Sequence, residues 1–150
     1  MIVRKLGVVL LLILASPLDA QEFKNGVVVS VSEPASEAGL AVLKQGGNAV
    51  DAAIATAFAL AVTHPAAGNI GGGGFMVVHP TKGSPIVIDY RETAPAKATR
   101  TMFKKDDSPY SHKVVGTPGT VRGMHLAHEK HGHLRWKSLV LPAVELAEKG

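Results

Sequence analysis

The hydrophobic pattern predicts a strand followed by a helix at the start of the regular part of the chain. Val27–Val31 is a short apolar run, typical of a strand. From Ser32 the apolar residues recur at helical spacing, so a helix is expected over 32–45 with Ser32 as a candidate N-cap. The pair Gly46-Gly47 fits the left-handed turn that ends many helices.

A second helix is predicted directly after this turn. As the N-cap, Asn48 places Asp51 at the third helical position, where a carboxylate can accept a hydrogen bond from the cap and oppose the helix dipole. The run Ala49–Val62 is apolar almost all round, which is typical of a buried helix. Pro65 disfavours helical backbone at the preceding residue and so predicts the end of this helix.

The pattern then changes from helical to alternating. Four consecutive glycines, 71–74, are unfavourable in a helix. The runs "FMVVH" and "PIVIDY" follow on either side of "PTKGS", which predicts a β-hairpin. Residues 93–113 are polar and irregular, so we expect a surface loop there.

Helical patterns return in the last third of the chain. Thr117 is a candidate N-cap and Pro118 a good first helical residue, which predicts a helix to about Lys130, ended by Gly132. Apolar residues at helical spacing predict a further helix over 136–149.

The first residues have a different character from the rest. Arg4 and Lys5 precede the apolar run Leu6–Ala15, and the small residue Ala20 offers a cleavage site. This order is typical of a secretory signal peptide, and the run is much shorter than the roughly 20 residues that span a bilayer. We therefore predict a signal peptide over 1–20, an exported protein (periplasmic or extracellular) and a mature part over 21–150. An uncleaved membrane anchor is the alternative.

Composition narrows the possible functions. Of the 150 residues, 46% are hydrophobic and 19% charged, which is enough apolar material for one packed core. The formal net charge of +4 is mild and the basic residues are dispersed, so nucleic acid is not an expected partner. The chain has no cysteine, which excludes disulfides, thiol catalysis and cysteine-ligated zinc.

The most informative polar residue is Arg91. The β-branched run before it ends abruptly in "DYRE", which places a guanidinium at the end of a strand, in an expected hydrophobic setting, between Asp89 and Glu92. A guanidinium can bind a carboxylate through two parallel hydrogen bonds. From the residues alone, an ion pair with Asp89 or Glu92 is the commoner explanation of such an arginine.

Other candidate sites are weaker. The glycine run precedes a strand rather than opening a helix, and it lacks the lysine of a phosphate-binding loop, so close backbone packing is the expected role. His125, His128, His131 and His133 invite a metal hypothesis, but no HExxH occurs and a solvated helix face explains them equally well. No metal site is therefore predicted.

Taken together, several stretches resemble the γ-glutamyltranspeptidases, also called glutathione hydrolases. The matching pieces are "GGNAVDAAIA", "GNIGGGGF", "DYRETAP", "VVGTPGTVRGM" and "LVLPAVELAEKG". They occur in the family's order, and the resemblance as a whole covers nearly all of residues 26–150. The first three in combination are highly specific.

The resemblance implies a fold and a chemistry. The fold would be α+β: a four-layer α/β/β/α sandwich of the N-terminal-nucleophile hydrolase type, of which only the N-terminal portion is present here. The family cleaves γ-glutamyl amides such as glutathione and transfers the γ-glutamyl group, through a threonine acyl-enzyme, to water or to an amino acid or peptide. Arg91 matches the arginine that binds the α-carboxylate of the γ-glutamyl group. No cofactor is implied.

The family's nucleophile has no match in this chain. It is the N-terminal threonine of a small subunit that the precursor releases by cutting itself, and it is expected downstream; Thr63 does not fit that motif. The chain alone is therefore expected to be inactive, with the small subunit of the same precursor as its partner. An acylase with a different acyl preference and a truncated, non-catalytic module are the alternatives.

Overall fold

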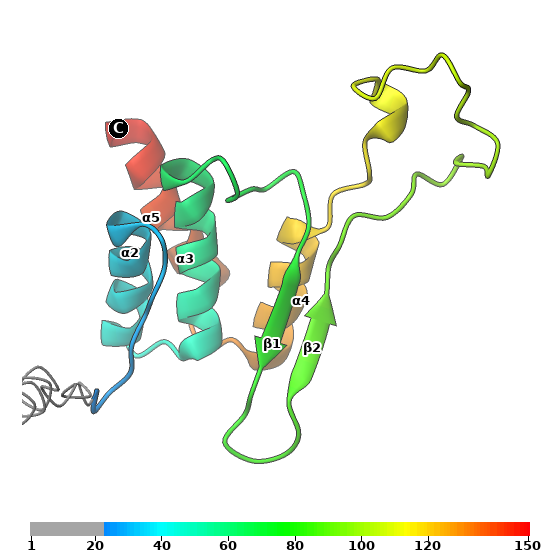
Figure 1. The fold of residues 1–150 in the computed structure, drawn as a ribbon. Helices are drawn as coiled ribbons and strands as arrows, with labels where there is room; N and C mark the ends of the chain where they lie inside the picture. Colours follow the sequence, from blue (N-terminus) through cyan, green and yellow to red (C-terminus); the bar gives the residue numbers. More distant parts are fainter. Residues whose placement is uncertain (1–22) are drawn as a thin grey trace, which may run out of the picture.

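A helical layer and a β-hairpin make up the computed structural model, which describes residues 23–150 (Figure 1). The elements are, in chain order, α2 (Glu33–Lys44), α3 (Ala49–Thr63), β1 (Phe75–Val78), β2 (Ile86–Asp89), the 3-10 turn η1 (His112–Val114), α4 (Thr120–His131) and α5 (Trp136–Lys149). Helix α3 packs against α2 and α5 on one side and against α4 on the other, and α4 also contacts β2. The described part is thus an α+β arrangement, as predicted.

Helix α3 begins and ends where the sequence predicts. The Asn48 side chain accepts hydrogen bonds from the backbone N–H groups of Val50 (2.9 Å) and Asp51 (3.0 Å). The Asp51 carboxylate accepts one in return from the N–H of Asn48 at 3.0 Å, so both halves of the capping box are present. The helix ends at Thr63, one residue before the His64 C-cap that precedes Pro65.

The core is built around α3 because this helix is apolar on nearly every face. Of its first eleven residues only Ala49, at the start of the helix, and Ala53 are exposed, so the prediction of a buried helix is confirmed. The main cluster of buried side chains consists of Val42, Val50, Ala52, Ile54, Ala55, Phe58, Ile88, Met124, Ala127, Leu139 and Ala143. Its many alanines allow the neighbouring helices to approach closely.

Asp51 also connects the two ends of the helical layer. Its carboxylate is fully buried, with 0% of the side chain exposed. Besides the cap bond, it accepts hydrogen bonds from the backbone N–H groups of His133 (3.0 Å) and Leu134 (3.3 Å), in the turn between α4 and α5. The Asn48 amide donates to the carbonyl of His131, the last residue of α4. One buried anion therefore joins the turn before α3 to a turn 82 residues later.

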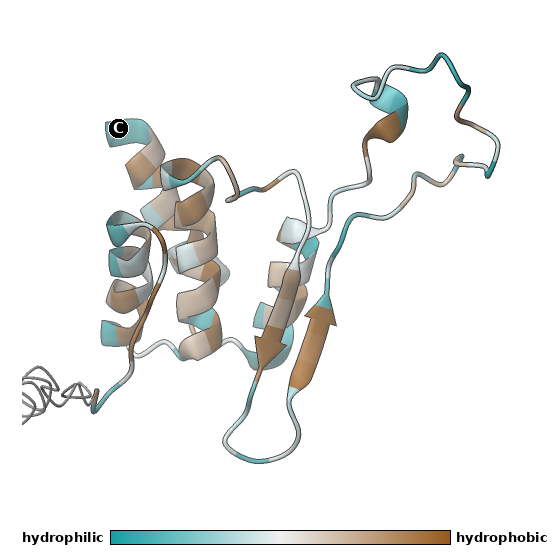
Figure 2. Ribbon diagram, in the orientation of Figure 1, coloured by the Kyte–Doolittle hydropathy of each residue, from teal (hydrophilic) through white to brown (hydrophobic). Residues whose placement is uncertain are grey.

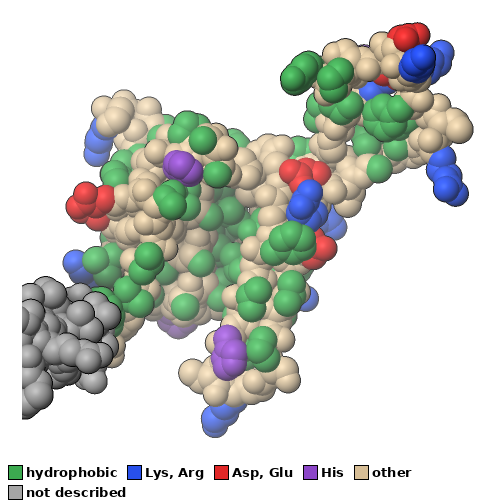
Figure 3. Space-filling model, viewed as in Figure 1, with side chains coloured by type: hydrophobic (Ala, Val, Ile, Leu, Met, Phe, Trp, Pro, Cys, Tyr) green, Lys and Arg blue, Asp and Glu red, His purple; other side chains and the backbone are tan. Residues whose placement is uncertain are grey.

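The predicted hairpin is present and has one open apolar face. β1 and β2 pair antiparallel, with Phe75 opposite Asp89 and Val77 opposite Val87. Met76 and Ile88, on the other face, pack into the core. Figure 2 shows both strands as strongly hydrophobic, and Figure 3 shows green side chains continuing over the hairpin, with charged groups near its upper end and on the loop beyond. Residues 93–113 form the predicted loop, closed by η1.

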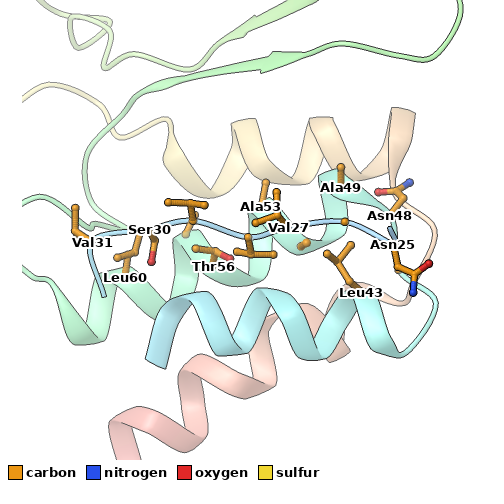
Figure 4. Close-up of a pocket in the computed structure, with 16 residues that line it drawn as sticks. Asn25, Val27, Ser30, Val31, Leu43, Asn48, Ala49, Ala53, Thr56 and Leu60 are labelled. Atoms are coloured by element: carbon orange, nitrogen blue, oxygen red, sulfur yellow. The ribbon is translucent and has the colours of Figure 1, made fainter. Parts of the chain in front are cut away.

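The strand predicted at Val27–Val31 is wrong. The segment is extended, but among residues 23–150 the sheet contains β1 and β2 alone, and no other extended segment pairs with it. It runs alongside α3 instead, over a groove of about 700 Å³ (Figure 4). Val29, in the middle of the segment, is 85% exposed. An apolar run has strand character in its sequence, but a strand needs a partner to satisfy its backbone groups.

Two predicted caps differ from the structure. Helix α4 begins at Thr120 with Gly119 as N-cap, three residues after the predicted cap Thr117. Thr117 exchanges two backbone hydrogen bonds with Thr93 (2.8 and 3.3 Å), which keeps it extended. Ser32 does stand at the N-cap of α2, but its hydroxyl donates to Oγ1 of Thr63 at 2.8 Å rather than capping the helix.

The remaining helix boundaries agree with the sequence. α2 ends in the predicted glycine pair, with Gly46 in the left-handed region at φ +88°. Gly132 is the C-cap of α4, and α5 spans the predicted range. The predicted signal peptide, residues 1–20, lies outside the described residues. Among those described, no helix is both long enough and apolar enough to cross a bilayer.

Replacing Asp51 by asparagine is expected to lower the free energy of unfolding by about 3 kcal/mol. The amide would turn a donor group toward backbone N–H groups that now donate to a buried carboxylate. Urea unfolding of the parent and variant proteins measures the change. Asp106→Asn, at an exposed aspartate, is the matched control and should change stability by less than about 0.5 kcal/mol. Equal effects of the two substitutions would contradict the assigned role of Asp51.

Candidate functional site

Arg91 lies immediately beyond the end of β2. The ladder continues one step past the strand, because the N–H of Tyr90 donates to the carbonyl of Gly74 at 3.0 Å. The N–H of Arg91 then donates to Oδ1 of Asp89 at 2.9 Å. Asp89 therefore fixes the backbone at Arg91 and does not pair with its guanidinium.

The guanidinium has one ion pair and one aromatic neighbour. Its Nε lies 3.3 Å from Oε2 of Glu92, and its central carbon lies 6.0 Å from the centroid of the Phe75 ring. Among residues 23–150, this ion pair is the one polar contact of the side chain, and the two terminal nitrogens are left open. Both interpretations of the sequence thus apply together: Glu92 orients the group, and its outer edge can bind a carboxylate through two hydrogen bonds.

The expected hydrophobic setting of Arg91 is not found. The side chain is 65% exposed. Its apolar neighbour Phe75 is also exposed and was missed in the sequence, although the hairpin register places it opposite Asp89, on the face that Arg91 shares. An exposed guanidinium is free to meet a ligand, but its position depends on the backbone that carries it.

The glycine run packs closely against that backbone, as predicted. The carbonyl of Gly72 accepts hydrogen bonds from the N–H groups of Gly119 (2.8 Å) and Thr120 (3.1 Å) at the start of α4. The N–H of Gly72 donates to Oδ1 of Asn69 at 2.9 Å, and the Thr120 hydroxyl donates to the same oxygen at 2.6 Å. The run therefore connects the end of α3 to α4 beneath the tip of β2.

Two of the four candidate histidines, His125 and His128, and Thr63 have structural partners. His128 Nε2 lies 2.7 Å from the carbonyl oxygen of Leu134, and its ring contacts Trp136. The ring of His125 also packs edge-on against Trp136, and its Nδ1 lies 3.5 Å from Oε2 of Glu129. In residues 23–150 no group of three or more potential metal-ligating side chains comes together. The Thr63 hydroxyl accepts from Ser32 and donates to the carbonyl of Ala59, so it is engaged within the helical layer.

Tyr90 separates the site from the core. Its ring lies between Gly74 and Gly123, and its hydroxyl donates to the carbonyl of Phe75 at 3.4 Å. Burial raises the pKa of Tyr90 above its ordinary value of 10.0, because the phenolate would lose hydration. A half-buried ring therefore lies directly before the exposed guanidinium in the chain.

Fold and site together define a class of protein. An arginine at the end of a strand, with its terminal nitrogens open and a helical layer behind the hairpin, defines an α+β protein with a candidate anion site at Arg91. The chain belongs to the γ-glutamyltranspeptidase family, whose family model, described as Gamma-glutamyltranspeptidase, matches residues 35–150.

Individual relatives agree with this assignment. The chain is 52% identical over 134 residues to the glutathione hydrolase proenzyme of Escherichia coli K12, a match that covers 85% of this chain and 23% of that protein. The crystal structure of Helicobacter pylori γ-glutamyltranspeptidase superposes with a TM-score of 0.81 at 46% identity, covering 87% of this chain and 40% of that one. The cephalosporin acylase of Bacillus halodurans superposes with a TM-score of 0.73 at 31% identity, covering 91% of this chain and 28% of that one. The chain spans about a quarter of the length of the curated relatives it matches.

An alkaline titration tests the burial of Tyr90. A raised pKa means that the ring's contribution to stability is complete below pH 10.0 and is lost as pH rises through the pKa of the folded protein. Absorbance at 295 nm should therefore show a late tyrosinate step, and this step should disappear in Tyr90→Phe. Tyr110→Phe removes the chain's other tyrosine, which is 94% exposed, and should retain the late step. A late step that survives in Tyr90→Phe would contradict the burial.

Proposed function

We propose that this chain forms the N-terminal part of the large subunit of an exported γ-glutamyl hydrolase/transferase, in which Arg91 binds the α-carboxylate of the γ-glutamyl group. The open guanidinium edge at the end of β2 carries the proposal. Its support is the motif around Arg91 in a chain that belongs to the family. Relatives of this chain bear the name glutathione hydrolase proenzyme, and glutathione is the substrate proposed here.

The proposed role of Arg91 is to fix the substrate before bond cleavage. Two parallel hydrogen bonds hold the α-carboxylate and so limit the positions of the γ-carbonyl carbon. A threonine outside this chain then attacks that carbon, and the amine leaves with a proton. The resulting γ-glutamyl ester is cleaved by water, giving glutamate, or by the amine of an amino acid or peptide, giving a new γ-glutamyl amide. No cofactor takes part in this scheme.

The proposed whole fold is a four-layer α/β/β/α sandwich completed by the small subunit of the same precursor. Two features of the described residues support it. The outer face of the hairpin exposes Phe75, Val77 and Val87, more apolar surface than a finished sheet leaves open. The extended segment 27–31 exposes backbone groups and valine side chains that are suited to a neighbouring strand.

An acylase with another acyl group is the second candidate. The likeness to a cephalosporin acylase over 91% of the chain favours it. Arg91 would then bind the carboxylate of a different acyl chain. Comparing γ-glutamyl, glutaryl and adipyl amides as substrates of the full-length gene product separates the two candidates, because only the γ-glutamyl group carries an α-amino group beside its α-carboxylate.

Arg91→Ala in the full-length gene product is expected to lower kcat/KM for a γ-glutamyl anilide at least about a hundredfold. A bidentate, charge-assisted contact is lost while the fold is preserved. Arg91→Lys keeps the charge but not the paired geometry, and should be nearly as impaired. Arg100→Ala, at an exposed position in the loop, is the control and should be unaffected. Unchanged kinetics in Arg91→Ala would remove the carboxylate-binding role.

Export is tested at the N-terminus. Removal of a signal peptide over residues 1–20 predicts that the protein recovered from the periplasm or the medium begins at Gln21. N-terminal sequencing measures this directly, and replacing Leu11 and Leu12 by arginine should block both cleavage and export, because it interrupts the apolar run. Recovery of the protein with Met1 in place, attached to the membrane, would favour an uncleaved anchor.

A further inference from the structure

Arg91 is exposed, so something other than side-chain packing must hold it in place. Its ion pair with Glu92 joins two partly exposed groups, and such pairs constrain a side chain weakly. The Phe75 ring offers only one further contact. A binding site needs its donors held to within a fraction of an ångström. The backbone at Tyr90 and Arg91 is therefore the element that has to be rigid.

Four glycines surround that backbone. Two belong to the glycine run and two to the start of α4. Together they are called the glycine cradle here: Gly73, Gly74, Gly119 and Gly123. A Cβ at Gly73 would lie 2.7 Å from the carbonyl oxygen of Tyr90, and one at Gly74 would lie 2.9 Å from the Tyr90 ring. Both distances are shorter than real Cβ contacts.

The α4 side of the cradle is tighter. A Cβ at Gly119 would collide with the carbonyl oxygen of Tyr90 and lie 3.2 Å from the carbonyl oxygen of Arg91. A Cβ at Gly123, one turn further along, would collide with Cβ and Cγ of Tyr90 and lie 2.6 Å from Cδ1. These clashes involve backbone or the base of a side chain, which cannot rotate away. Because Gly119 and Gly123 have no side chains, α4 can approach Tyr90 and Arg91 this closely.

Hydrogen bonds complete the enclosure on both sides of Arg91. The Tyr90 N–H is bonded to Gly74, and the pair Thr93–Thr117 closes the backbone two residues after Arg91. The tyrosine ring points to α4, so the next side chain, Arg91, points to the opposite face, where Phe75 lies. A shift of Tyr90 away from α4 therefore moves the guanidinium toward the substrate side.

We infer that Gly119 and Gly123 are positioning residues for substrate recognition. Because they have no side chains, Tyr90 can pack directly against α4, and this contact determines the position of the Arg91 guanidinium. That position in turn determines how strongly a substrate carboxylate is selected. This inference rests on the proposed function, because it assigns to the cradle the placement of a carboxylate-binding group. The effect should appear in selectivity rather than in folding alone.

The test compares two substrates in the full-length gene product. One is a γ-glutamyl anilide, and the other is the same compound with its α-carboxylate replaced by a carboxamide. The ratio of the two kcat/KM values measures recognition of the carboxylate. Gly123→Ala and Gly119→Ala should each lower this ratio at least about tenfold, mainly through a raised KM for the carboxylate substrate.

Gly39→Ala is the matched control. A Cβ there would collide with Thr56 and lie 2.9 Å from Val28, a clash of the same kind between α2 and α3, far from Arg91. It should lower the melting temperature as the cradle variants do, while leaving the ratio at the parent value. A parent-like ratio in folded Gly123→Ala and Gly119→Ala would overturn the inference and leave the cradle a packing feature only.

If the alanine variants do not fold, Tyr90→Leu tests the same inference. It removes the ring without adding bulk, so it should fold and should also lower the ratio; a parent-like ratio would overturn the inference.

Arg91→Ala separates this inference from the proposed function. A lost ratio in Arg91→Ala with a retained ratio in the cradle variants would reject the inference alone. A retained ratio in Arg91→Ala would reject the proposed function, and the inference with it.

Discussion

The buried carboxylate of Asp51 is the constraint on which the arrangement of the helices depends. An anion without solvent needs several donors, and here backbone N–H groups supply them from the start of α3 and from the turn between α4 and α5. Any large movement of that turn would leave the charge unpaired. The position of α4 against α3 is thus set by electrostatics as well as by apolar packing.

The site inherits its geometry from this arrangement. α4 is held at its C-terminal end by the bonds to Asp51 and at its N-terminal end by the carbonyl of Gly72. It presents two glycines to Tyr90, Gly119 at its N-terminal end and Gly123 one turn further along. The exposed guanidinium of Arg91 is consequently carried on a rigid backbone while its outer edge remains open to a ligand. Tyr90 thus supplies the rigid, enclosed backbone, and the neighbouring Arg91 supplies the exposed side chain.

The apolar surfaces of the described residues are likewise partly buried and partly open. Helix α3 buries its side chains on nearly all sides, yet the groove beside residues 25–31 and the outer face of the hairpin remain apolar and open (Figure 4). These surfaces lie on the sides that α4 and α5 do not cover. They agree with a chain that spans about a quarter of its curated relatives, and they are the surfaces that the proposed sandwich would cover.

The sequence by itself determined the features that depend on neighbouring residues. The capping box of Asn48 and Asp51, the apolar run of α3, the alternation in the hairpin and the arginine after β2 are all local patterns, so the structure reproduces them. Only the tertiary structure decided that 27–31 lacks a strand partner and that Thr117 pairs with Thr93 instead of capping α4. It also decided that Asp51 binds a turn 82 residues away. These outcomes depend on which distant backbone groups become available, and the spacing of residues along a chain does not encode that availability.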